Sequence, residues 1–419
     1  MSTRAAMLAQ HFGKHPRLAL PTSQILSSDT MESQSCKPRD QSSSQDKQQA
    51  QVIALRFYDK ETVKVDRISA LTCQADEVRI QIAYCGICGS DIHEYQHGPH
   101  VAPAQGSKHP YSGVQLPVIL GHEMSGTIVE IGSKVSGLQV GQRVAVNPSL
   151  DDRSYDGNLC PSCQRGQINI CKRWGTYGYN APSGGFATEA VVKSFNCFPI
   201  PDNVPLSVGA LAEPLAVAWH MIRVSEFKRG QTALILGAGP IGIAILLGLK
   251  SMGASVVIVT EIADGRARQA ATFGADIVIN PLKPQSGDSK RGDAVTEAVS
   301  SLTKDGVDVA FDASGLQSTL DAALASTRPG GTICNVAIRH GPVKVDLNEL
   351  IYREKRIVGG ICYTTQDFKD VIAAMGQGEI PFEAMITSIV PLEDAHVGGI
   401  LELIKNKSNH LKILISPQS

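Results

Sequence analysis

Cysteine, histidine and acidic side chains gather in two short segments of the first half of the chain. Residues 85–93 read CGICGSDIH, and residues 121–126 read GHEMSG. Thiolate, imidazole and carboxylate groups are ligands that zinc prefers, and a catalytic zinc uses three of them and keeps one position open. Each segment supplies a ligand and a carboxylate able to orient it. The two segments together predict a catalytic zinc site. We prefer this interpretation to the alternative in which Cys85 and Cys88 form a redox pair and His122 is an ordinary core histidine.

A second group of cysteines has the spacing Cys160-x2-Cys163-x7-Cys171. Three thiolates are one ligand short of the four that a closed structural zinc site uses. The acidic residues nearby that could supply the fourth ligand are Asp151, Asp152 and Asp156. Two interpretations therefore stay open for this segment, a structural zinc site and a metal-free loop.

A glycine-rich turn later in the chain has the features of a dinucleotide site. It follows the apolar run TALIL, opens a helix-like segment, and consists of Gly237, Ala238, Gly239, Pro240, Ile241 and Gly242. Backbone N–H groups at such a helix start bind a pyrophosphate. Glu261 ends the next apolar run, where its carboxylate can accept hydrogen bonds from ribose hydroxyls and repels a 2′-phosphate. The turn predicts NAD in preference to NADP, with Arg266 either a further cofactor contact or a solvated helix residue.

The segments around these residues indicate two kinds of fold. From Gln51 onward the chain carries short β-rich runs separated by Gly, Asp and Ser turns, which predict a β-rich domain. Further along, buried-strand candidates alternate with helix-like segments, as in a parallel doubly wound sheet. The strand candidates are residues 232–236, 256–260, 277–279, 307–311 and 332–336, and the helical ones are 241–252 and 265–273. The last part of the chain is expected to form helices at 365–375 and 392–405 and a strand at 411–415 that returns to the first domain.

Length and composition exclude several classes of protein. The 419 residues predict two to three domains, and 42% hydrophobic and 19% charged residues are ordinary for a globular chain. The formal net charge of -1 gives no overall positive electrostatic potential that would attract nucleic acid or anionic lipid. The uncharged run 232–249 is about long enough to cross a membrane, but glycines and a proline interrupt it. We therefore expect a small-molecule ligand, no nucleic acid and no membrane.

Residues 1–50 differ from the rest of the chain. Half of residues 31–50 are Ser or Gln, a composition that predicts disorder. The first 28 residues carry basic side chains and no acidic one, which faintly resembles an organellar transit peptide. The expected location is the cytoplasm, with the mitochondrion as the alternative.

Taken together, these segments resemble the zinc-containing medium-chain alcohol dehydrogenases. VGSKVSGLQVGQRVAV, GGFATEAVV and AEPLAVAWH also match that family, in the family's order. The resemblance implies an α/β protein with a GroES-like catalytic domain, residues 51–210 and 353–419, interrupted by a Rossmann domain, residues 211–352. It places the active site in the cleft between them. It also implies a homodimer or homotetramer.

Within this family the chain is most similar to the sorbitol and butanediol dehydrogenases, because AEPLAVAWH puts Glu213 where the alcohol dehydrogenases have a cysteine. By this resemblance the zinc ligands are Cys88, His122 and Glu213, the last directly or through water. Glu123 would either alternate with another group as a zinc ligand or lie just outside the ligands of the zinc. Asp91 would orient His122. Cys85 matches no ligand position. In the second cysteine group, the family's first cysteine is replaced by Gly157.

The resemblance implies zinc-dependent hydride transfer between NAD(H) and a secondary alcohol. The segments ALRFYDKETVKVDRI and HGPHVAPAQGSKHPYSGVQLP are most similar to (R,R)-butanediol dehydrogenases, which favours (R,R)- or meso-2,3-butanediol and acetoin. The alternatives are a sorbitol- or xylitol-type polyol dehydrogenase and, from another class, a non-catalytic dinucleotide-binding protein. By the same resemblance, Ser90 and His93 would pass the alcohol's proton to water. Four residues of the insertion are expected to rim the substrate mouth: His97, His100, His109 and Tyr111.

Overall fold

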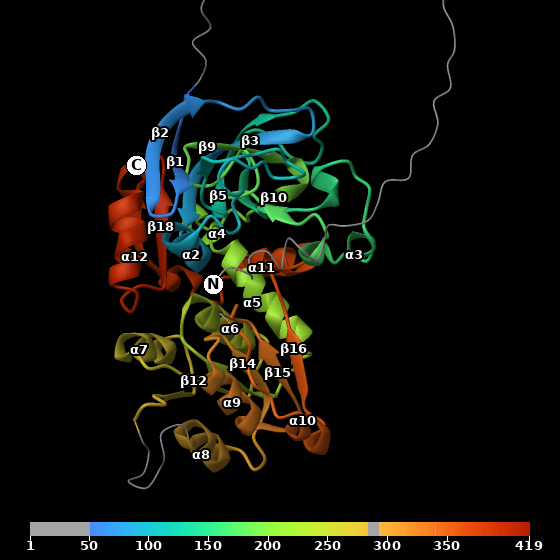
Figure 1. Ribbon diagram of the computed structural model, residues 1–419, viewed down its shortest axis with the longest axis vertical. Coiled ribbons are helices and arrows are strands. Elements are labelled where there is room, and N and C mark those ends of the chain that lie inside the picture. Colours follow the sequence, from blue (N-terminus) through green and yellow to red (C-terminus); the bar gives the residue numbers. More distant parts are fainter. Residues whose placement is uncertain (1–50, 284–292, 340) are drawn as a thin grey trace, which may run out of the picture.

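The computed structural model describes residues 51–283, 293–339 and 341–419. Figure 1 shows two lobes, one built mainly of strands and one in which helices flank a sheet. The disorder predicted for residues 1–50 lies outside the described residues. Within the described ranges, no helix combines the length and the apolar character needed to cross a membrane.

The β-rich lobe is organised around a seven-stranded sheet of order β10-β6-β5-β3-β18-β17, in which β9 also pairs with β3. Its strands are β3 (Glu77–Gly86), β5 (Glu123–Ile131), β6 (Arg143–Val146), β9 (Glu189–Lys193), β10 (Cys197–Pro199), β17 (Ile386–Pro391) and β18 (Lys412–Ser416). The C-terminal strand β18 runs antiparallel to β3, with Leu414 opposite Gly86. The end of the chain therefore returns to the first lobe, as predicted.

Two smaller sheets and several short helices complete this lobe. Two further sheets are formed by β1 (Gln51–Asp59), β2 (Thr62–Ser69) and β4 (Val118–Ile119), and by β7 (Ser149–Leu150) and β8 (Gly175–Thr176). The helices are α2 (Gly89–His97), α3 (Pro161–Gln164) and α4 (Leu206–Gly209), with single 3-10 turns at η1 (Asp152–Ser154), η2 (Ile168–Ile170), η3 (Ser194–Asn196) and η4 (Phe382–Met385).

The second lobe is built on a six-stranded sheet of order β13-β12-β11-β14-β15-β16, in which all neighbours are parallel. The strands are β11 (Thr232–Leu236), β12 (Val256–Thr260), β13 (Ile277–Ile279), β14 (Val307–Asp312), β15 (Thr327–Asn335) and β16 (Arg356–Gly359). The helices are α6 (Pro240–Ser251), α7 (Asp264–Thr272), α8 (Asp293–Leu302), α9 (Gln317–Ser326) and α10 (Leu347–Arg353). The strand order reverses between β11 and β14, the position at which doubly wound sheets bind their ligands.

Helices α5 (Ala212–Val224) and α11 (Thr365–Gln377) pack between the lobes, and one hydrophobic core includes residues of both. Strand β16 lies beyond residue 352 although it belongs to the parallel sheet. The second lobe thus extends past the boundary expected from the sequence, because an edge strand of four residues gives only a weak periodic signal.

The predicted helix at 392–405 is present in a different form. It begins as a 3-10 turn, η5 (Leu392–Asp394), continues as a π-helix, η6 (Ala395–Leu401), and ends in α12 (Glu402–Lys405). The Asp394 side chain accepts a hydrogen bond from the Gly398 N–H, 3.2 Å away. A Cβ at Gly398 would lie 2.1 Å from Asp394 Oδ2, so a larger residue there would displace the Asp394 carboxylate from this contact.

Candidate active site

Pairing of β3 with β5 assembles the first group of metal-ligating side chains. Gly86 at the end of β3 lies opposite Glu123 at the start of β5, so Cys88, two residues after β3, comes next to His122 and Glu123. One ligand atom from each of these three residues lies within 4.8 Å of the others. His122 and Glu123 are buried. The structure therefore brings the two segments together.

The donor set of this cluster fits a zinc ion. It combines a thiolate, an imidazole and a carboxylate, as a catalytic zinc site requires. Among the described side chains, Glu123 Oε2 is buried without a hydrogen-bond partner. A buried carboxylate oxygen without a partner is costly, and a cation bound between the three residues would remove that cost.

Asp91 lies behind His122. Its carboxylate accepts hydrogen bonds from the Cys88 N–H at 2.9 Å and from the Tyr179 hydroxyl at 2.7 Å. Asp91 Oδ1 is 3.6 Å from His122 Nδ1. Burial disfavours the charged imidazole, but the nearby Asp91 carboxylate outweighs it and raises the pKa of His122 well above its usual value. Asp91 is placed where it can orient His122, and Tyr179, which sequence reasoning missed, holds Asp91.

Glu123 forms a buried ion pair with a residue from the other end of the chain. Lys412 Nζ lies 2.6 Å from Glu123 Oε1 and also donates a hydrogen bond to the Ile87 carbonyl at 3.1 Å. Burial lowers the pKa of Lys412, but the Glu123 carboxylate more than compensates, so the pKa is raised. Sequence reasoning missed Lys412; the signal was a lysine within the apolar run LKILIS.

Glu213 lies in the first turn of α5 and faces the same cleft, but it is not part of the cluster formed by Cys88, His122 and Glu123. Burial, with the charge of Glu123, raises the pKa of Glu213 to about 7 against the opposing effect of His122. The geometry thus groups Glu123 with Cys88 and His122, whereas the resemblance implied Glu213 as the third zinc ligand. Contact of Glu213 with a metal stays a prediction.

The two lobes enclose a cavity of about 2150 Å³. Cys88 and His122 line it from the first lobe, and Glu213 lines it from α5. The other predicted site residues on its wall are Ser90, His93, Glu123, Gly237, Gly239, Pro240, Ile241, Gly242, Glu261 and Arg266. The cavity lies at the carboxyl ends of β11 and β14, where the strand order reverses, so the metal cluster and the glycine-rich turn open into one space.

The glycine-rich turn has the tight geometry that a pyrophosphate site needs. Gly237 has a φ of 106°, a value that favours glycine. A Cβ at Gly242 would lie 2.0 Å from the Gly237 carbonyl oxygen, so a larger residue would break the packing of α6 on β11. Helix α6 then begins at Pro240, and its first residues line the cavity, where a helix N-terminus favours an anionic group.

Glu261 lies directly beside this turn. Its carboxylate accepts hydrogen bonds from the N–H groups of Ala238, Ile262 and Ala263, each at 2.9 Å. Arg266 donates from Nη2 to the Lys407 carbonyl in the first lobe at 2.5 Å. Burial lowers the pKa of Arg266, and the Glu261 charge opposes that effect. Both residues line the cavity beside the glycine-rich turn, and their contact with a dinucleotide stays a prediction.

Ser90 and His93 lie on α2, three residues apart and so on the same helix face. Ser90 Oγ is 3.3 Å from His122 Nε2 and 3.2 Å from the Tyr179 hydroxyl oxygen. The four residues expected at the substrate mouth do not line the cavity. His97 and His100 contact the ring of His93, whereas His109 and Tyr111 contact each other and Tyr111 packs near Tyr155 and Arg173.

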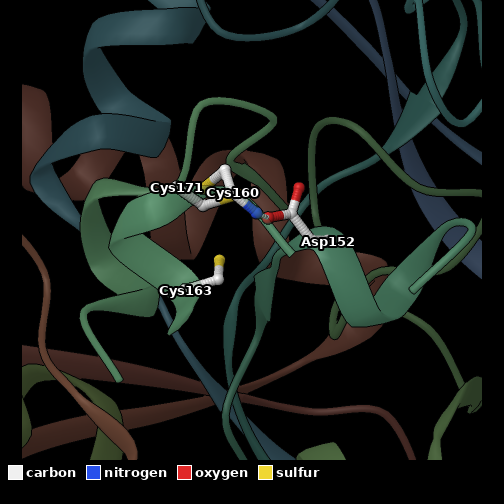
Figure 2. A group of neighbouring side chains, drawn as sticks. All are labelled: Asp152, Cys160, Cys163 and Cys171. Carbon is white, nitrogen blue, oxygen red and sulfur yellow. Dashed lines mark hydrogen bonds between the residues drawn. The ribbon is translucent and has the colours of Figure 1, made fainter. Parts of the chain in front are cut away.

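In the second cysteine group, one of the three candidate acids, Asp152, lies beside the sulfur atoms. Figure 2 shows Asp152 facing Cys160, Cys163 and Cys171, and one ligand atom of each lies within 4.8 Å of the others. Asp152 accepts hydrogen bonds from Arg173 Nε and from the Cys160 N–H, both at 2.6 Å. These contacts hold the carboxylate against the three sulfur atoms.

The other two candidate acids lie outside the cluster, and each pairs with an arginine. Asp151 pairs with Arg153 at 2.6 Å, and Asp156 pairs with Arg173 at 2.7 Å. Burial raises the pKa of Cys171 to about 11, so a nearby cation would be needed to keep this thiol ionised at neutral pH. Three sulfur atoms and a carboxylate are a donor set that fits a four-coordinate zinc.

Comparison with known proteins agrees with this geometry. The family model described as alcohol dehydrogenase GroES-like domain matches residues 74–202, and the model described as zinc-binding dehydrogenase matches residues 240–377. An (R,R)-butanediol dehydrogenase of Saccharomyces cerevisiae is 39% identical over 360 residues, which cover 82% of this chain and 92% of the relative. A sorbitol dehydrogenase of Bombyx mori is 33% identical, covering 85% and 96% of the two chains.

A solved structure has the same fold. The 2R,3R-butanediol dehydrogenase from Bacillus subtilis matches with a TM-score of 0.79 and 31% identity, covering 87% of this chain and 99% of that one. A GroES-like lobe, a Rossmann lobe and a zinc-type cluster in the cleft between them define an oxidoreductase that uses a metal and a nicotinamide dinucleotide. The chain belongs to the zinc-binding medium-chain dehydrogenases and is a zinc- and NAD-dependent alcohol dehydrogenase. The predicted family and architecture are therefore confirmed.

Proposed function

We propose that the enzyme interconverts a vicinal secondary diol and the corresponding hydroxyketone, with (R,R)- or meso-2,3-butanediol and acetoin as its main pair. The observation that carries the proposal is the cluster of Cys88, His122 and Glu123 in the cleft, with Glu213 on the same wall. A metal held partly by carboxylate suits a substrate with two neighbouring oxygen atoms. The names of the butanediol dehydrogenases among the relatives support this choice, and the sorbitol dehydrogenase supports a polyol as the second candidate.

Cys88, His122 and Glu123 would hold the zinc, with Glu213 within the same cleft. When bound, zinc supplies a Lewis acid that favours loss of a hydroxyl proton, and NAD supplies the hydride acceptor. Asp91 keeps His122 in place, and Lys412 offsets the charge of Glu123. Ser90 lies where its hydroxyl can take the substrate proton, and His93 lies on the same helix face to receive it.

The substrate proposal is tested by measuring NADH formation by the full-length protein with (R,R)-butanediol, meso-butanediol, sorbitol and xylitol in parallel. The expected result is the highest kcat/KM for a butanediol isomer. A higher kcat/KM for sorbitol or xylitol would favour the polyol alternative. Turnover of none of the four would contradict both candidates.

Glu261 is proposed to select NAD by accepting hydrogen bonds from the adenosine ribose. Replacing it with alanine removes a carboxylate that would repel a 2′-phosphate, while Arg266 remains beside the site. The ratio of kcat/KM for NAD to that for NADP should fall about 10- to 100-fold, since a hydrogen bond to a charged group contributes about 1.5–3 kcal/mol. Asp264→Ala, which changes an exposed acid at the start of α7, is the control and should keep the ratio. An unchanged ratio in Glu261→Ala would contradict the assignment.

We further propose that Asp152 is the fourth ligand of a structural zinc with Cys160, Cys163 and Cys171. Asp152→Ala should lower the zinc content by about one equivalent per chain, because closed structural sites use four ligands. The midpoint of thermal unfolding should fall by at least about 5 °C. Zinc is measured by elemental analysis after dialysis and unfolding by calorimetry. Asp156→Ala removes another acid that pairs with Arg173 and should keep the zinc; equal zinc loss in both variants would contradict the role of Asp152.

A homodimer is the assembly we propose. Strand β16 is an edge of the parallel sheet, and apolar side chains near it are strongly exposed, among them Tyr352 at 83% and Ile351 at 67%. Exposed edges and apolar patches are features of association surfaces. Sedimentation should show a dimer for the unchanged protein and a monomer for Ile351→Glu. A monomer at micromolar concentration without substitution would contradict this proposal.

A further inference from the structure

Three histidine rings are stacked beside the cleft. His93 and His97 are one helical turn apart on α2, and their ring centroids are 4.9 Å apart. The His100 ring lies 5.1 Å from His93, with an angle of 36° between the planes. His93 is therefore the central ring and has an imidazole on either side.

A buried carboxylate fixes this arrangement. Glu94, which is 1% exposed, accepts hydrogen bonds from the backbone N–H groups of His100, Val101 and Ala102, at 2.8, 3.1 and 3.0 Å. These three contacts fold the loop after α2 back onto the helix. Because Glu94 contacts the backbone of His100 and not its ring, the loop position does not depend on the imidazole.

The three rings differ in their exposure to solvent. His93 is half-buried and lines the cavity, together with Ser90 on the same helix face. His97 and His100 are exposed and do not line the cavity. The two outer rings, His97 and His100, thus connect His93 in the cavity wall with the surface of the protein.

Oxidation of an alcohol by NAD+ gives a carbonyl compound, NADH and one proton, so a proton must leave the cleft in each turnover. Imidazole titrates near neutral pH and can accept a proton at one ring nitrogen while releasing another from the second. At these ring separations one water molecule can bridge neighbouring nitrogens, a distance over which acid–base groups exchange protons. We propose that His97 and His100 carry the proton from His93 to bulk water. This inference rests on the proposed function of the cleft.

Two other ionisable side chains on or beside α2, Glu94 and His396, have contacts of their own. The Glu94 carboxylate is occupied by three backbone N–H groups. His396, in η6, also contacts α2: its Nε2 is 3.0 Å from the Tyr95 hydroxyl, and it does not line the cavity. His396 therefore provides a control imidazole that contacts α2 but lies outside the cavity.

The test follows NADH formation and proton release in the same stopped-flow experiment with the zinc-loaded enzyme, NAD and (R,R)-butanediol. Weakly buffered solution and a pH-indicator dye report the proton. In the unchanged enzyme, the two signals should rise together. In His97→Gln/His100→Gln, NADH should form at the usual rate in the first turnover, and proton release should lag behind it about three- to tenfold. That effect is smaller than the roughly 10²–10⁴-fold contribution of a positioned acid–base group, because water gives a slower parallel route.

Steady-state measurements separate proton transfer from a structural effect. The double variant should have a lower kcat with an unchanged KM, and added imidazole should restore kcat. His396→Gln should behave like the unchanged enzyme. Proton release in step with NADH in the double variant, or a loss of kcat that imidazole does not restore, would overturn the proposal. If the unchanged enzyme oxidised no diol or polyol, the proposed function itself would be overturned.

Discussion

Replacing Cys88 with alanine is expected to lower kcat/KM for the diol by at least about 10³-fold, because a zinc ion contributes several kcal/mol to such reactions and each 1.36 kcal/mol is a factor of ten. Cys88 is the one thiol in the cluster with His122 and Glu123. Its loss leaves an imidazole and a carboxylate, one ligand fewer than a catalytic zinc requires. The zinc content should fall by about one equivalent in parallel, measured by elemental analysis.

Cys85→Ala is the matched control for this experiment. Cys85 is only three residues away and completely buried, and burial raises its pKa well above the usual value for a thiol. It is not part of the metal cluster. The control should keep both its zinc and its turnover, apart from a small loss of stability. Retained zinc and turnover in Cys88→Ala would show that the ligand assignment is wrong.

The second large effect is expected at the buried pair of Glu123 and Lys412. Lys412→Met leaves the Glu123 carboxylate buried without its cation, and breaking a buried pair in this way costs about 3–5 kcal/mol. The free energy of unfolding should fall by this amount in urea titrations of the zinc-free protein. Zinc must be removed because a bound cation would partly replace the lysine charge.

Two further variants show whether the loss comes from the ion pair. Glu123→Gln combined with Lys412→Met removes both charges and should recover most of the lost stability. Lys355→Met removes another buried lysine, but its partner Glu349 is 46% exposed, so the remaining carboxylate stays hydrated and the loss should be smaller. Equal destabilisation by the single and double variants at Glu123 and Lys412 would contradict the account.

The parts of the site that sequence reasoning found are those in which ligands are close along the chain. Cys88 and His122 lie at the ends of strands that pair directly, and the turn with Glu261 follows a single strand–helix–strand unit. In both cases local spacing determines the geometry. The parallel sheet was predictable for the same reason, because β11 and β12 are continuous apolar runs buried on both faces.

The residues that were missed or left open depend on packing between distant segments. Lys412 is 289 positions from Glu123, and Tyr179 is 88 positions from Asp91. Asp151, Asp152 and Asp156 could not be ranked from the sequence, because the folding of the loop determines which carboxylate faces the sulfur atoms, and all three pair with arginines. His109 and Tyr111 were placed at the substrate mouth only because they belong to the insertion, whose path cannot be predicted from composition.

NADH formation with (R,R)-butanediol before zinc removal, after it, and after zinc is added back tests the central claim most directly. We expect turnover to fall with the zinc content and to return when zinc is restored. The Cys85→Ala variant should respond in the same way as the unchanged protein. Undiminished diol oxidation by zinc-free enzyme would contradict the account, because the cluster in the cleft would then have no role in the reaction.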